Sequence, residues 1–258
     1  MGELNFKPRV PTFDANIGVG HGFDQPAPFD DAAKLLDEMD RHGVGRALIY
    51  HIQGEAISAL DGNEALAEWA NGEARFSLQW TASPVTDSLR QLQEFHAVGK
   101  VKSVRLHNTQ LGSAAVEIPF VDWVYGELLE WLQAERLPLW ISLADTRPTE
   151  IMGTLKRFPD LVTVLLGAHY THAVLVRPLL KHLPNAHLEL SRYEVLGGIE
   201  ALKNEFGAQR LIYGSFYPRY AMGPILYSIH HTGLNDRELS AICWGNIKRI
   251  LGEEGGDD

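Results

Sequence analysis

The sequence predicts one α/β domain, a (β/α)8 TIM barrel over residues 1–258, and three observations support this fold class. The length of 258 residues is typical of a single barrel of this kind. Short β-branched or apolar runs alternate with longer amphipathic runs along the whole chain, as in repeated βα units around a parallel sheet. The Pro and Gly residues are scattered, so no linker divides the chain.

Eight short runs are apolar enough to be barrel strands, because a buried parallel strand carries nearly continuous apolar side chains. In chain order they are Pro11–Gly18, Val44–Ile52, Arg75–Thr81, Val101–His107, Pro138–Ala144, Leu161–Ala168, Ala186–Ser191 and Arg210–Ser215. After the first strand we expect a helix, capped by Asp30 or Asp31, whose apolar face consists of Phe29, Ala33, Leu36 and Met39. The acidic, glycine-rich end, at about residues 252–258, is expected to be a short disordered tail.

The charge balance excludes several classes of partner. The chain carries 33 acidic and 23 basic side chains, a formal net charge of -10, and no cluster of Lys or Arg. A phosphate backbone or an anionic lipid surface is repelled by this charge, so we expect neither a nucleic acid nor a membrane as a partner. No stretch is apolar enough to predict a signal peptide or a membrane span. The single cysteine, Cys243, cannot form a disulfide within the chain, which is typical of a cytoplasmic protein.

Reacting and binding groups of such a barrel project from the C-terminal ends of its strands, so polar residues there are the candidates for a site. They are Asp14, Asn16, His51, Gln53, Trp80, Arg105, His107, Ser142, Asp145, His169, Glu189, Ser191, Ser215 and Tyr217. Arg105 lies within a predicted strand, where a guanidinium is costly to bury without an anion. Two interpretations stay open for Arg105: a site for an anion or carboxylate, and an ion pair with a carboxylate of the barrel.

Several stretches resemble the amidohydrolase-related family, the barrel group that includes aminocarboxymuconate-semialdehyde decarboxylase, aromatic-acid decarboxylases and dicarboxylate lactonases. They run from about residue 11 to residue 251 in the order expected of the family. The stretches are Gly43–Tyr50, Gly62–Glu64, Val104–His107, Leu137–Ile141, Phe158–Leu161, Phe206–Ser215, and Asn246 ahead of Ile250 and Leu251. The resemblance implies a metal-dependent hydrolase-like TIM barrel, with activity as a hydrolase or a carbon–carbon lyase.

The resemblance also implies five metal-ligand positions, four of them His and the last an Asp, and this sequence departs from the family at each. In chain order the five positions fall on Asp14, Asn16, Ser142, Gly167 and Phe216, with His169 displaced by two residues from the fourth. A transition metal needs three or four N, O or S donors that converge at about 2.0–2.2 Å. We therefore expect no metal and no other cofactor.

The first hypothesis is a metal-free barrel that binds a small anionic organic molecule at its C-terminal mouth and slowly hydrolyses or decarboxylates it. The candidate catalytic residues are Asp14, His51 and His169. The candidate substrate-binding residues are Asn16, Arg105, His107, Ser142, Ser215, Phe216 and Tyr217. In this hypothesis Arg105 holds a carboxylate, and Phe216 fills the space that the metal and its Asp occupy in relatives.

Two alternatives stay open at this point. One is a metal-dependent hydrolase or decarboxylase whose ligands, with Asp14 and His169 among them, are displaced from the family positions. The other is a catalytically silent barrel that serves as a binding or assembly partner. The sequence is compatible with a monomer and with a homo-oligomer, and it names no substrate, because a fold does not fix a function.

Overall fold

The computed structural model describes residues 6–21, 31–108 and 118–253, and its strands are all parallel. A three-stranded sheet consists of β1 (Phe13–Val19), β2 (Arg46–His51) and β3 (Phe76–Leu78). A six-stranded sheet consists of β4 (Trp80–Ala82), β5 (Val104–Leu106), β6 (Leu139–Ser142), β7 (Thr163–Leu166), β8 (Ala186–Glu189) and β9 (Leu211–Ile212).

Backbone hydrogen bonds at two seams close these sheets into one barrel. The third predicted strand, Arg75–Thr81, is interrupted at Gln79, where β3 leaves off pairing with β2 and β4 begins to pair with β5. At the other seam the N–H of Ala15 donates to the carbonyl of Tyr213 at 3.1 Å. The N–H of Gly18 likewise donates to the carbonyl of Tyr217 at 2.7 Å. With β3 and β4 counted as one strand, the described residues form the eight-stranded barrel that the sequence predicts.

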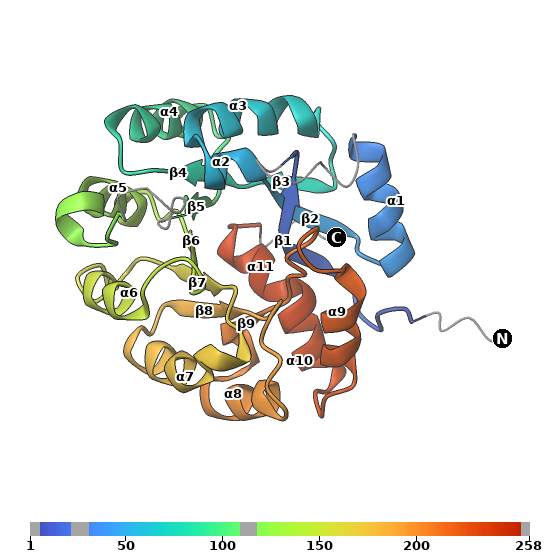
Figure 1. The fold of residues 1–258 in the computed structure, drawn as a ribbon. Helices are drawn as coiled ribbons and strands as arrows, with labels where there is room; N and C mark the ends of the chain where they lie inside the picture. The colour runs from blue at the N-terminus through green and yellow to red at the C-terminus, as the bar shows by residue number, and fades with distance from the viewer. Residues whose placement is uncertain (1–5, 22–30, 109–117, 254–258) are drawn as a thin grey trace.

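Helices surround the strands, as Figure 1 shows. The longer ones are α1 (Ala32–His42), α3 (Ala59–Ala70), α4 (Thr86–Ala97), α5 (Asp122–Ala134), α6 (Pro148–Leu155), α7 (Ala173–His182), α8 (Gly198–Phe206) and α9 (Met222–His230). The short ones are α2 (Ile52–Ala56), η1 (Tyr170–His172), η2 (Ala208–Arg210), α10 (Asp236–Ser240), the π-helical η3 (Ala241–Gly245) and α11 (Asn246–Ile250). Within the described part of the chain, no helix combines the length and the apolar character needed to cross a membrane.

Helix α1 begins where one of the two predicted caps places it, and its buried face agrees with the prediction in part. The carboxylate of Asp31 accepts the N–H of Lys34 at 3.0 Å and caps the helix. Met39, which the sequence analysis placed on the apolar face, is buried, and Leu36 of the same face is partly buried against the core. Ala33 is exposed, and Leu35 is buried in addition. The prediction was wrong at Ala33 because several spacings of apolar residues fit one helix, and packing against the barrel selects among them. The predicted contributions of residues 29 and 30 lie outside the described residues.

The C-terminal segment closes the N-terminal end of the barrel. Glu253 pairs with Arg46 at the start of β2, at 2.7 Å, and with Lys102 just before β5, at 3.3 Å. Glu253 is therefore an ordered ion-pair partner, although the sequence analysis assigned it to the disordered tail; residues 254–258 lie outside the described part. The strands finish at the other end, where the sites of TIM barrels lie.

Two stretches that resemble the family have structural roles at the helix–barrel boundary. A Cβ on Gly62 of α3 would lie 2.2 Å from the Cα of Gly54 in α2, so only glycine permits this contact. The amide of Asn63 donates to the carbonyl of Thr81 at 2.9 Å and accepts its N–H at 2.7 Å, which ties α3 to β4. Asn246 donates to the carbonyls of Ala208 and Leu211, both at 2.8 Å.

We predict that Gly62→Ala lowers the free energy of unfolding by about 1–3 kcal/mol, because the added methyl overpacks the contact between α2 and α3. Gly126→Ala is the matched control, since nothing lies within 4 Å of a Cβ at that position in α5. This control should be neutral or stabilising by up to about 1 kcal/mol. Urea unfolding curves of the two variants and the wild type provide the comparison, and equal stability of the two variants would contradict the packing argument.

Candidate functional site

Arg105 is the centre of a polar layer inside the barrel. Its side chain is 1% exposed, and its guanidinium lies 3.7 Å from the centroid of the Tyr50 ring. Nε donates to Oε1 of Glu55 at 2.7 Å, and Nη1 donates to Oδ1 of Asn16 at 3.1 Å and more weakly to Oε1 of Gln79 at 3.4 Å. The ion-pair interpretation of Arg105 is thus realised, with a carboxylate from the short helix α2.

The remaining nitrogen of this guanidinium leaves room for a second acceptor. Nη2 is buried and has no hydrogen-bond partner among the residues that the structure describes. Glu55 bonds to Nε alone, so the side of the guanidinium that presents Nε and Nη2 together is only half used. A buried donor without an acceptor costs about 1–3 kcal/mol, and more when it is charged. The geometry therefore fits a ligand oxygen at Nη2.

The polar layer continues from Arg105 through Asn16 to Glu189 at the end of β8. The amide nitrogen of Asn16 donates to Oε2 of Glu189 at 3.2 Å. Ser191 donates its N–H to Oε1 and its hydroxyl to Oε2, both at 2.8 Å. Burial raises the pKa of Glu189 from 4.5 to about 7, and these hydrogen bonds oppose that rise. A carboxyl with such a pKa changes its protonation state near neutrality, as a general acid or base must.

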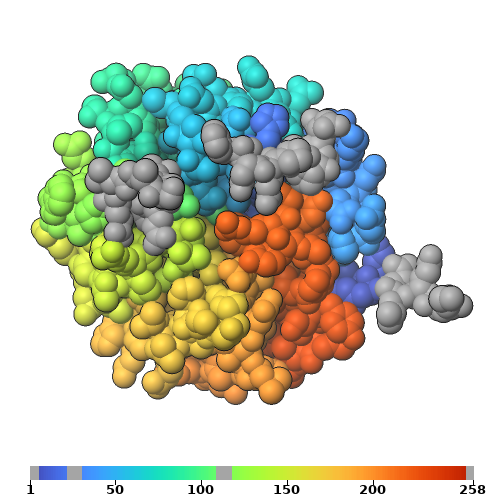
Figure 2. Space-filling view, viewed as in Figure 1, coloured from blue at the N-terminus to red at the C-terminus, as the bar shows by residue number. Residues whose placement is uncertain are grey.

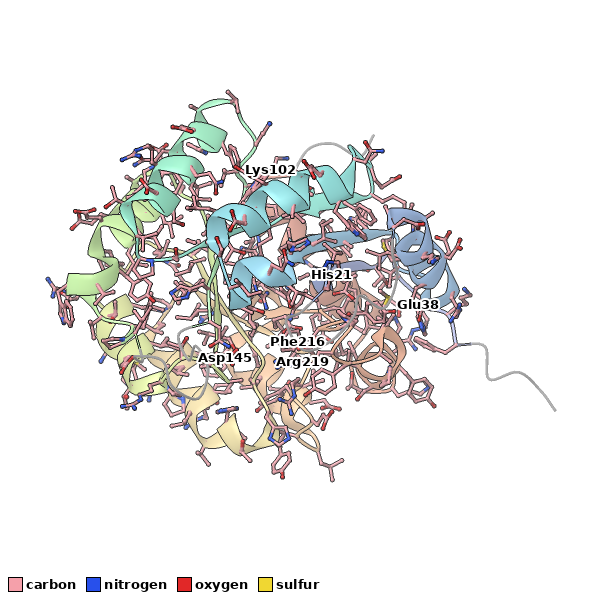
Figure 3. The ribbon with its side chains drawn as sticks, turned by 45° about the horizontal axis from the view of Figure 1, so that its top comes forward. His21, Glu38, Lys102, Asp145, Phe216 and Arg219 are labelled. Atoms are coloured by element: carbon pink, nitrogen blue, oxygen red, sulfur yellow. The ribbon has the colours of Figure 1, made fainter. Side chains whose placement is uncertain are left out.

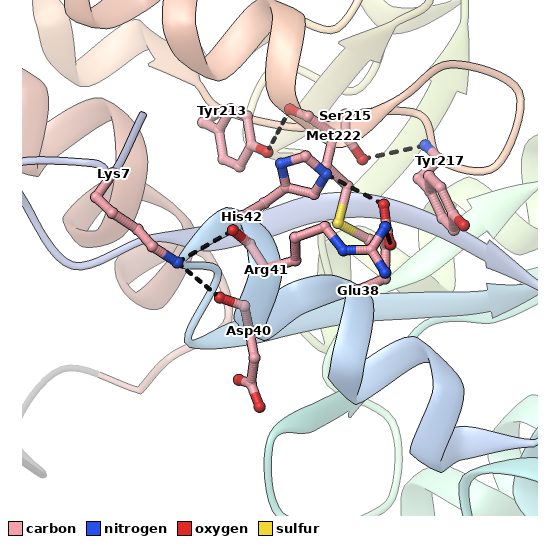
Figure 4. A network of polar contacts seen from close by, with 9 residues as sticks. All are labelled: Lys7, Glu38, Asp40, Arg41, His42, Tyr213, Ser215, Tyr217 and Met222. Carbon is pink, nitrogen blue, oxygen red and sulfur yellow. Dashed lines mark hydrogen bonds and ion pairs between the residues drawn. The ribbon is translucent and has the colours of Figure 1, made fainter. Parts of the chain in front are cut away.

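Asp14 holds the seam between β1 and the segment after β9. It is fully buried, and its Oδ1 accepts the N–H of Asn16 at 3.0 Å and that of Ser215 at 2.9 Å. Burial raises its pKa from 3.8 to about 6. The hydroxyl of Ser215 in turn accepts the N–H of Tyr217 at 3.1 Å, as Figure 4 shows beside the C-terminal turn of α1. Both Ser215 and Tyr217 therefore belong to this seam.

Phe216 lies against Gly167, as the sequence analysis expected. A Cβ on Gly167 would lie 3.8 Å from Cε1 of Phe216 and 3.5 Å from Oγ of Ser142, so both side chains adjoin this glycine. Phe216 is 3% exposed, and the centroid of its ring is 5.9 Å from the guanidinium carbon of Arg105. The hydroxyl of Ser142 donates to Oδ2 of Asp145 at 2.6 Å. Phe216 and Ser142 thus both adjoin Gly167, and Phe216 also lies near Arg105.

Two of the predicted histidines are buried in other contacts. His51 ends β2, and its ring packs so tightly on the loop after β1 that a Cβ on Gly20 would lie 2.1 Å from Nε2. His107 shares a hydrogen bond of 2.8 Å between Nε2 and the hydroxyl of Tyr125. Burial lowers the pKa of both imidazoles, that of His107 to about 4, so His107 is neutral at physiological pH.

His169, the third predicted catalytic residue, makes its hydrogen bonds with residues next to it in the chain. Its Nδ1 is 3.1 Å from the hydroxyl of Thr171, and its N–H donates to Nδ1 of His172. Among the described residues, no hydrogen bond or ion pair joins any two of Asp14, His51 and His169. The structure brings together Asn16, Arg105, Phe216 and Ser142, whereas the proposed catalytic trio does not share a hydrogen-bond network.

The resemblance to the amidohydrolase-related family implies a metal ion, and the side chains that could act as its ligands test this expectation. Over residues 6–21, 31–108 and 118–253, no three His, Cys, Asp or Glu side chains are arranged to hold a metal ion. Asn16, which occupies one of the five implied ligand positions, instead accepts a hydrogen bond from the positively charged guanidinium of Arg105. A cation there would be repelled, so the described residues do not fit the metal site that the resemblance implies.

Sequence reasoning did not select three partners of Arg105. Glu55 and Gln79 are ordinary polar residues near strand ends, and no spacing marks them as partners of a residue some 26 to 50 positions away. Tyr50 lies within a mostly apolar strand, where an aromatic ring is expected to be part of the hydrophobic core. The one available signal was the buried arginine itself, because a guanidinium inside a barrel requires a carboxylate and hydrogen-bond acceptors around it.

We predict that Glu55→Gln lowers the free energy of unfolding by about 3–5 kcal/mol, because it leaves the buried guanidinium of Arg105 without a carboxylate. The matched control is Asp87→Asn, which breaks the ion pair with Arg90 on the surface of α4, where the two side chains are 68% and 62% exposed. The control should cost less than about 1 kcal/mol. Guanidinium chloride unfolding measures both; a loss for Glu55→Gln no larger than that of the control would show that the pair with Arg105 is not required.

A second prediction concerns pH. The carboxyl of Glu189 titrates near 4.5 in the unfolded chain and near 7 in the folded one, so the folded protein binds more protons between these values. The contribution of Glu189 to stability is therefore fully present below about pH 4.5 and is lost as the pH rises through 7. Glu189→Gln should flatten the decline in unfolding free energy between pH 4.5 and 7, whereas the exposed Glu68→Gln controls for the lost charge. If the unfolding free energies of wild type and Glu189→Gln fall in parallel between pH 4.5 and 7, the raised pKa of Glu189 is ruled out.

Comparison with solved structures places the fold among amidohydrolase and decarboxylase barrels. An uncharacterised TIM-barrel protein from Bordetella bronchiseptica matches with a TM-score of 0.76 and 17% identity, over 97% of this chain and 100% of the other. The 5-carboxyvanillate decarboxylase from Sphingomonas paucimobilis matches with 0.74 and 15%, over 94% and 99%. A dihydroxybenzoic acid decarboxylase from Polaromonas, solved with manganese and the inhibitor 2-nitroresorcinol, matches with 0.75 and 14%, over 94% and 97%.

At these identities the solved structures establish the TIM-barrel fold alone. No curated protein matches the chain in sequence. The sequence model of the amidohydrolases, however, matches residues 19–252, from the end of β1 to the C-terminal segment that closes the barrel. Because that match covers nearly the whole barrel, the chain belongs to the amidohydrolase family.

Proposed function

We propose that this amidohydrolase-family barrel binds a small aromatic carboxylate at its C-terminal mouth, through Arg105 and without a metal. The observation that carries the proposal is the Nη2 atom of Arg105, which is buried and has no acceptor among the described residues. A carboxylate oxygen supplies the missing acceptor in a charge-assisted hydrogen bond. The Asp145 and Glu55 carboxylates are already bonded to Ser142 and to Arg105 respectively.

The surroundings of Arg105 suit an aromatic acid. The rings of Tyr50 and Phe216 lie 3.7 and 5.9 Å from its guanidinium carbon, so a planar ligand meets flat apolar surfaces next to the cation. A cavity of about 280 Å³ is lined by Glu55, the ion-pair partner of Arg105, and by His107, but not by Arg105 itself. Two solved structures with the same fold support this ligand class by their names, since one is a 5-carboxyvanillate decarboxylase and the other a dihydroxybenzoic acid decarboxylase.

The polar layer then divides into residues that orient Arg105 and residues that meet the ligand. Asn16 and Gln79 fix Nη1, and Ser142 lies beside Phe216 at the edge of the same space. We include slow hydrolysis or decarboxylation of the bound acid in the proposal. Glu189, whose pKa is about 7 and which reaches Arg105 through Asn16, is the group best suited to give or take a proton.

The test compares binding of benzoate with that of benzyl alcohol, its uncharged analogue, by isothermal titration calorimetry on protein dialysed without a chelator. Benzoate should bind and raise the melting temperature, whereas benzyl alcohol should bind at least about tenfold more weakly, since one charge-assisted hydrogen bond contributes about 1.5–3 kcal/mol. Arg105→Lys keeps the charge and removes Nη2, so it should lose most of this preference.

Two outcomes would contradict the proposal. Equal affinity for benzoate and benzyl alcohol would show that no cation receives the carboxylate. One tightly bound equivalent of zinc, manganese or iron per chain, found by elemental analysis of the same preparation, would favour a metal-dependent enzyme with displaced ligands instead. Circular dichroism of Arg105→Lys checks that the variant is folded before its affinity is interpreted.

A further inference from the structure

Another cavity lies at the N-terminal end of the barrel, between the starts of three neighbouring strands, β5, β6 and β7, and the C-terminal segment. It has a volume of about 360 Å³, and three cationic side chains line it: Lys102 before β5, Arg136 before β6 and Arg249 on α11. Its other lining residues are apolar or glycine: Val101, Leu137, Val162, Ile250, Leu251 and Gly252. Among the residues that the structure describes, no acidic side chain lines this cavity.

This cavity is separate from the mouth of the barrel. Figure 3 shows Lys102 apart from Asp145, Phe216 and Arg219, which lie at the mouth. Figure 2 shows the mouth itself, where the orange surface of the segment after β9 borders the yellow surface of the segments after β7 and β8. The three cations of the cavity are far apart in the sequence, and the fold brings them together at the other end of the barrel.

The positive charge at this cavity is only partly neutralised. Glu253 pairs with Lys102 at 3.3 Å and with Arg46 at 2.7 Å, so one carboxylate is shared between two cations. Arg249 donates a hydrogen bond from Nη2 to the carbonyl of Gln209 at 3.0 Å, and it has no ion pair with a carboxylate of the described residues. In a chain of net charge -10, a surplus of cations around one cavity indicates attraction of an anion.

The charge of Arg249 also acts on His187 inside the barrel. His187 is buried on β8, and its Nδ1 has no hydrogen-bond partner in the described part of the chain. Burial, and then the charges of Arg249 and Arg210, lower the pKa of His187 to about 4. The positive field of this end therefore reaches into the barrel, and His187 stays neutral within it at physiological pH.

Arg136 is held beside the cavity in an unfavourable backbone conformation. It follows the C-terminus of α5 with a φ of 56°, in the left-handed region that favours glycine. Its side chain is exposed and has no hydrogen bond or ion pair with another described residue. Glu130 and Asp160 border Arg136 on a neighbouring groove, and neither carboxylate pairs with it. Contacts within the described chain thus do not explain why an arginine occupies this strained position.

We infer that this cavity binds a small organic phosphate, whose phosphoryl group is received by the three cations and whose apolar body lies against the apolar lining. A phosphate monoester carries a charge of about -1.5 to -2 and three acceptor oxygens, which suits three cations better than a single carboxylate does. Guanidinium groups match the geometry of phosphate oxygens, and a lysine adds a point charge. The inference is independent of the proposed function, because the cavity includes no residue assigned to the mouth.

The apolar lining favours such a ligand over the end of the chain itself. Val162 and Ile250 are the half-buried members of this lining, so an apolar group can cover them. The last residues, 254–258, include three carboxylate side chains but no apolar side chain. A phosphate joined to an apolar body therefore complements both the cations and the lining.

The experiment measures the affinity for phenyl phosphate by isothermal titration calorimetry, with inorganic phosphate and phenol as the two halves of this ligand. The wild type should bind phenyl phosphate at least about tenfold more tightly than either half, and the affinity should fall as salt is raised. Arg249→Gln and Arg136→Gly should each weaken the binding about tenfold or more, because each removes a charge-assisted hydrogen bond. Arg90→Gln, at an exposed position of α4 that does not line the cavity, is the matched control and should change the affinity by less than about twofold.

Two variants separate this site from other causes of weaker binding. Glycine adopts the left-handed conformation without steric cost, so the melting temperature of Arg136→Gly should equal or exceed that of the wild type. A loss of affinity in this variant then reports the missing guanidinium and not a loss of folding. Arg105→Lys alters the mouth, and it should leave the affinity for phenyl phosphate within about twofold of the wild type.

Several results would overturn the inference. They are no binding of phenyl phosphate to the wild type, equal affinity of the wild type, Arg136→Gly and Arg249→Gln, loss of binding in Arg105→Lys, and equal affinity for phenyl phosphate and inorganic phosphate. A chain that ends at Glu253 and binds phenyl phosphate about tenfold more tightly than the full chain would assign the cavity to the acidic end of the chain instead. None of these results changes the affinity for benzoate, which tests the proposed function separately.

Discussion

The burial of one guanidinium inside the barrel determines the arrangement of the polar layer. A cation that is 1% exposed requires acceptors on several sides, and the chain supplies them from α2, β1 and the seam between β3 and β4. The side-chain oxygen of Asn16 accepts a hydrogen bond from Arg105. The buried amide nitrogen of Asn16 then also needs an acceptor, and Glu189 provides it. The remaining nitrogen of this guanidinium, Nη2, has no hydrogen-bond acceptor among the described residues.

The sequence was sufficient for the barrel and for the identity of its central cation. Alternating apolar runs and strand-end polar residues are local patterns, and they located Arg105 and Asn16. The neighbourhood of Phe216 and Gly167 was expected from the resemblance to the family. Partners such as Glu55 were not predictable, because the bond from Arg105 joins residues 50 positions apart and depends on how α2 packs on β4. The exposure of Ala33 on α1 and the ordered Glu253 were missed for the same reason, since tertiary contacts decide both.

The two ends of the barrel differ in how their polar groups are paired. The N-terminal end is closed by the C-terminal segment, through ion pairs of Glu253 with Arg46 and Lys102. The C-terminal end carries buried carboxyls with raised pKa values, an incompletely satisfied arginine, and two arginines, Arg192 and Arg219, without a carboxylate partner among the described residues. The proposed function puts ligand recognition at the end opposite these ion pairs, as in TIM barrels generally.

The most direct test of the account is a crystal structure of the protein soaked or grown with benzoate. The account predicts a carboxylate oxygen within about 2.7–2.9 Å of Nη2 of Arg105, the usual length of a charge-assisted hydrogen bond, with the benzoate ring near Tyr50 and Phe216. Benzoate bound elsewhere while Nη2 of Arg105 contacts only protein or water, or a metal ion coordinated at the barrel mouth, would contradict it.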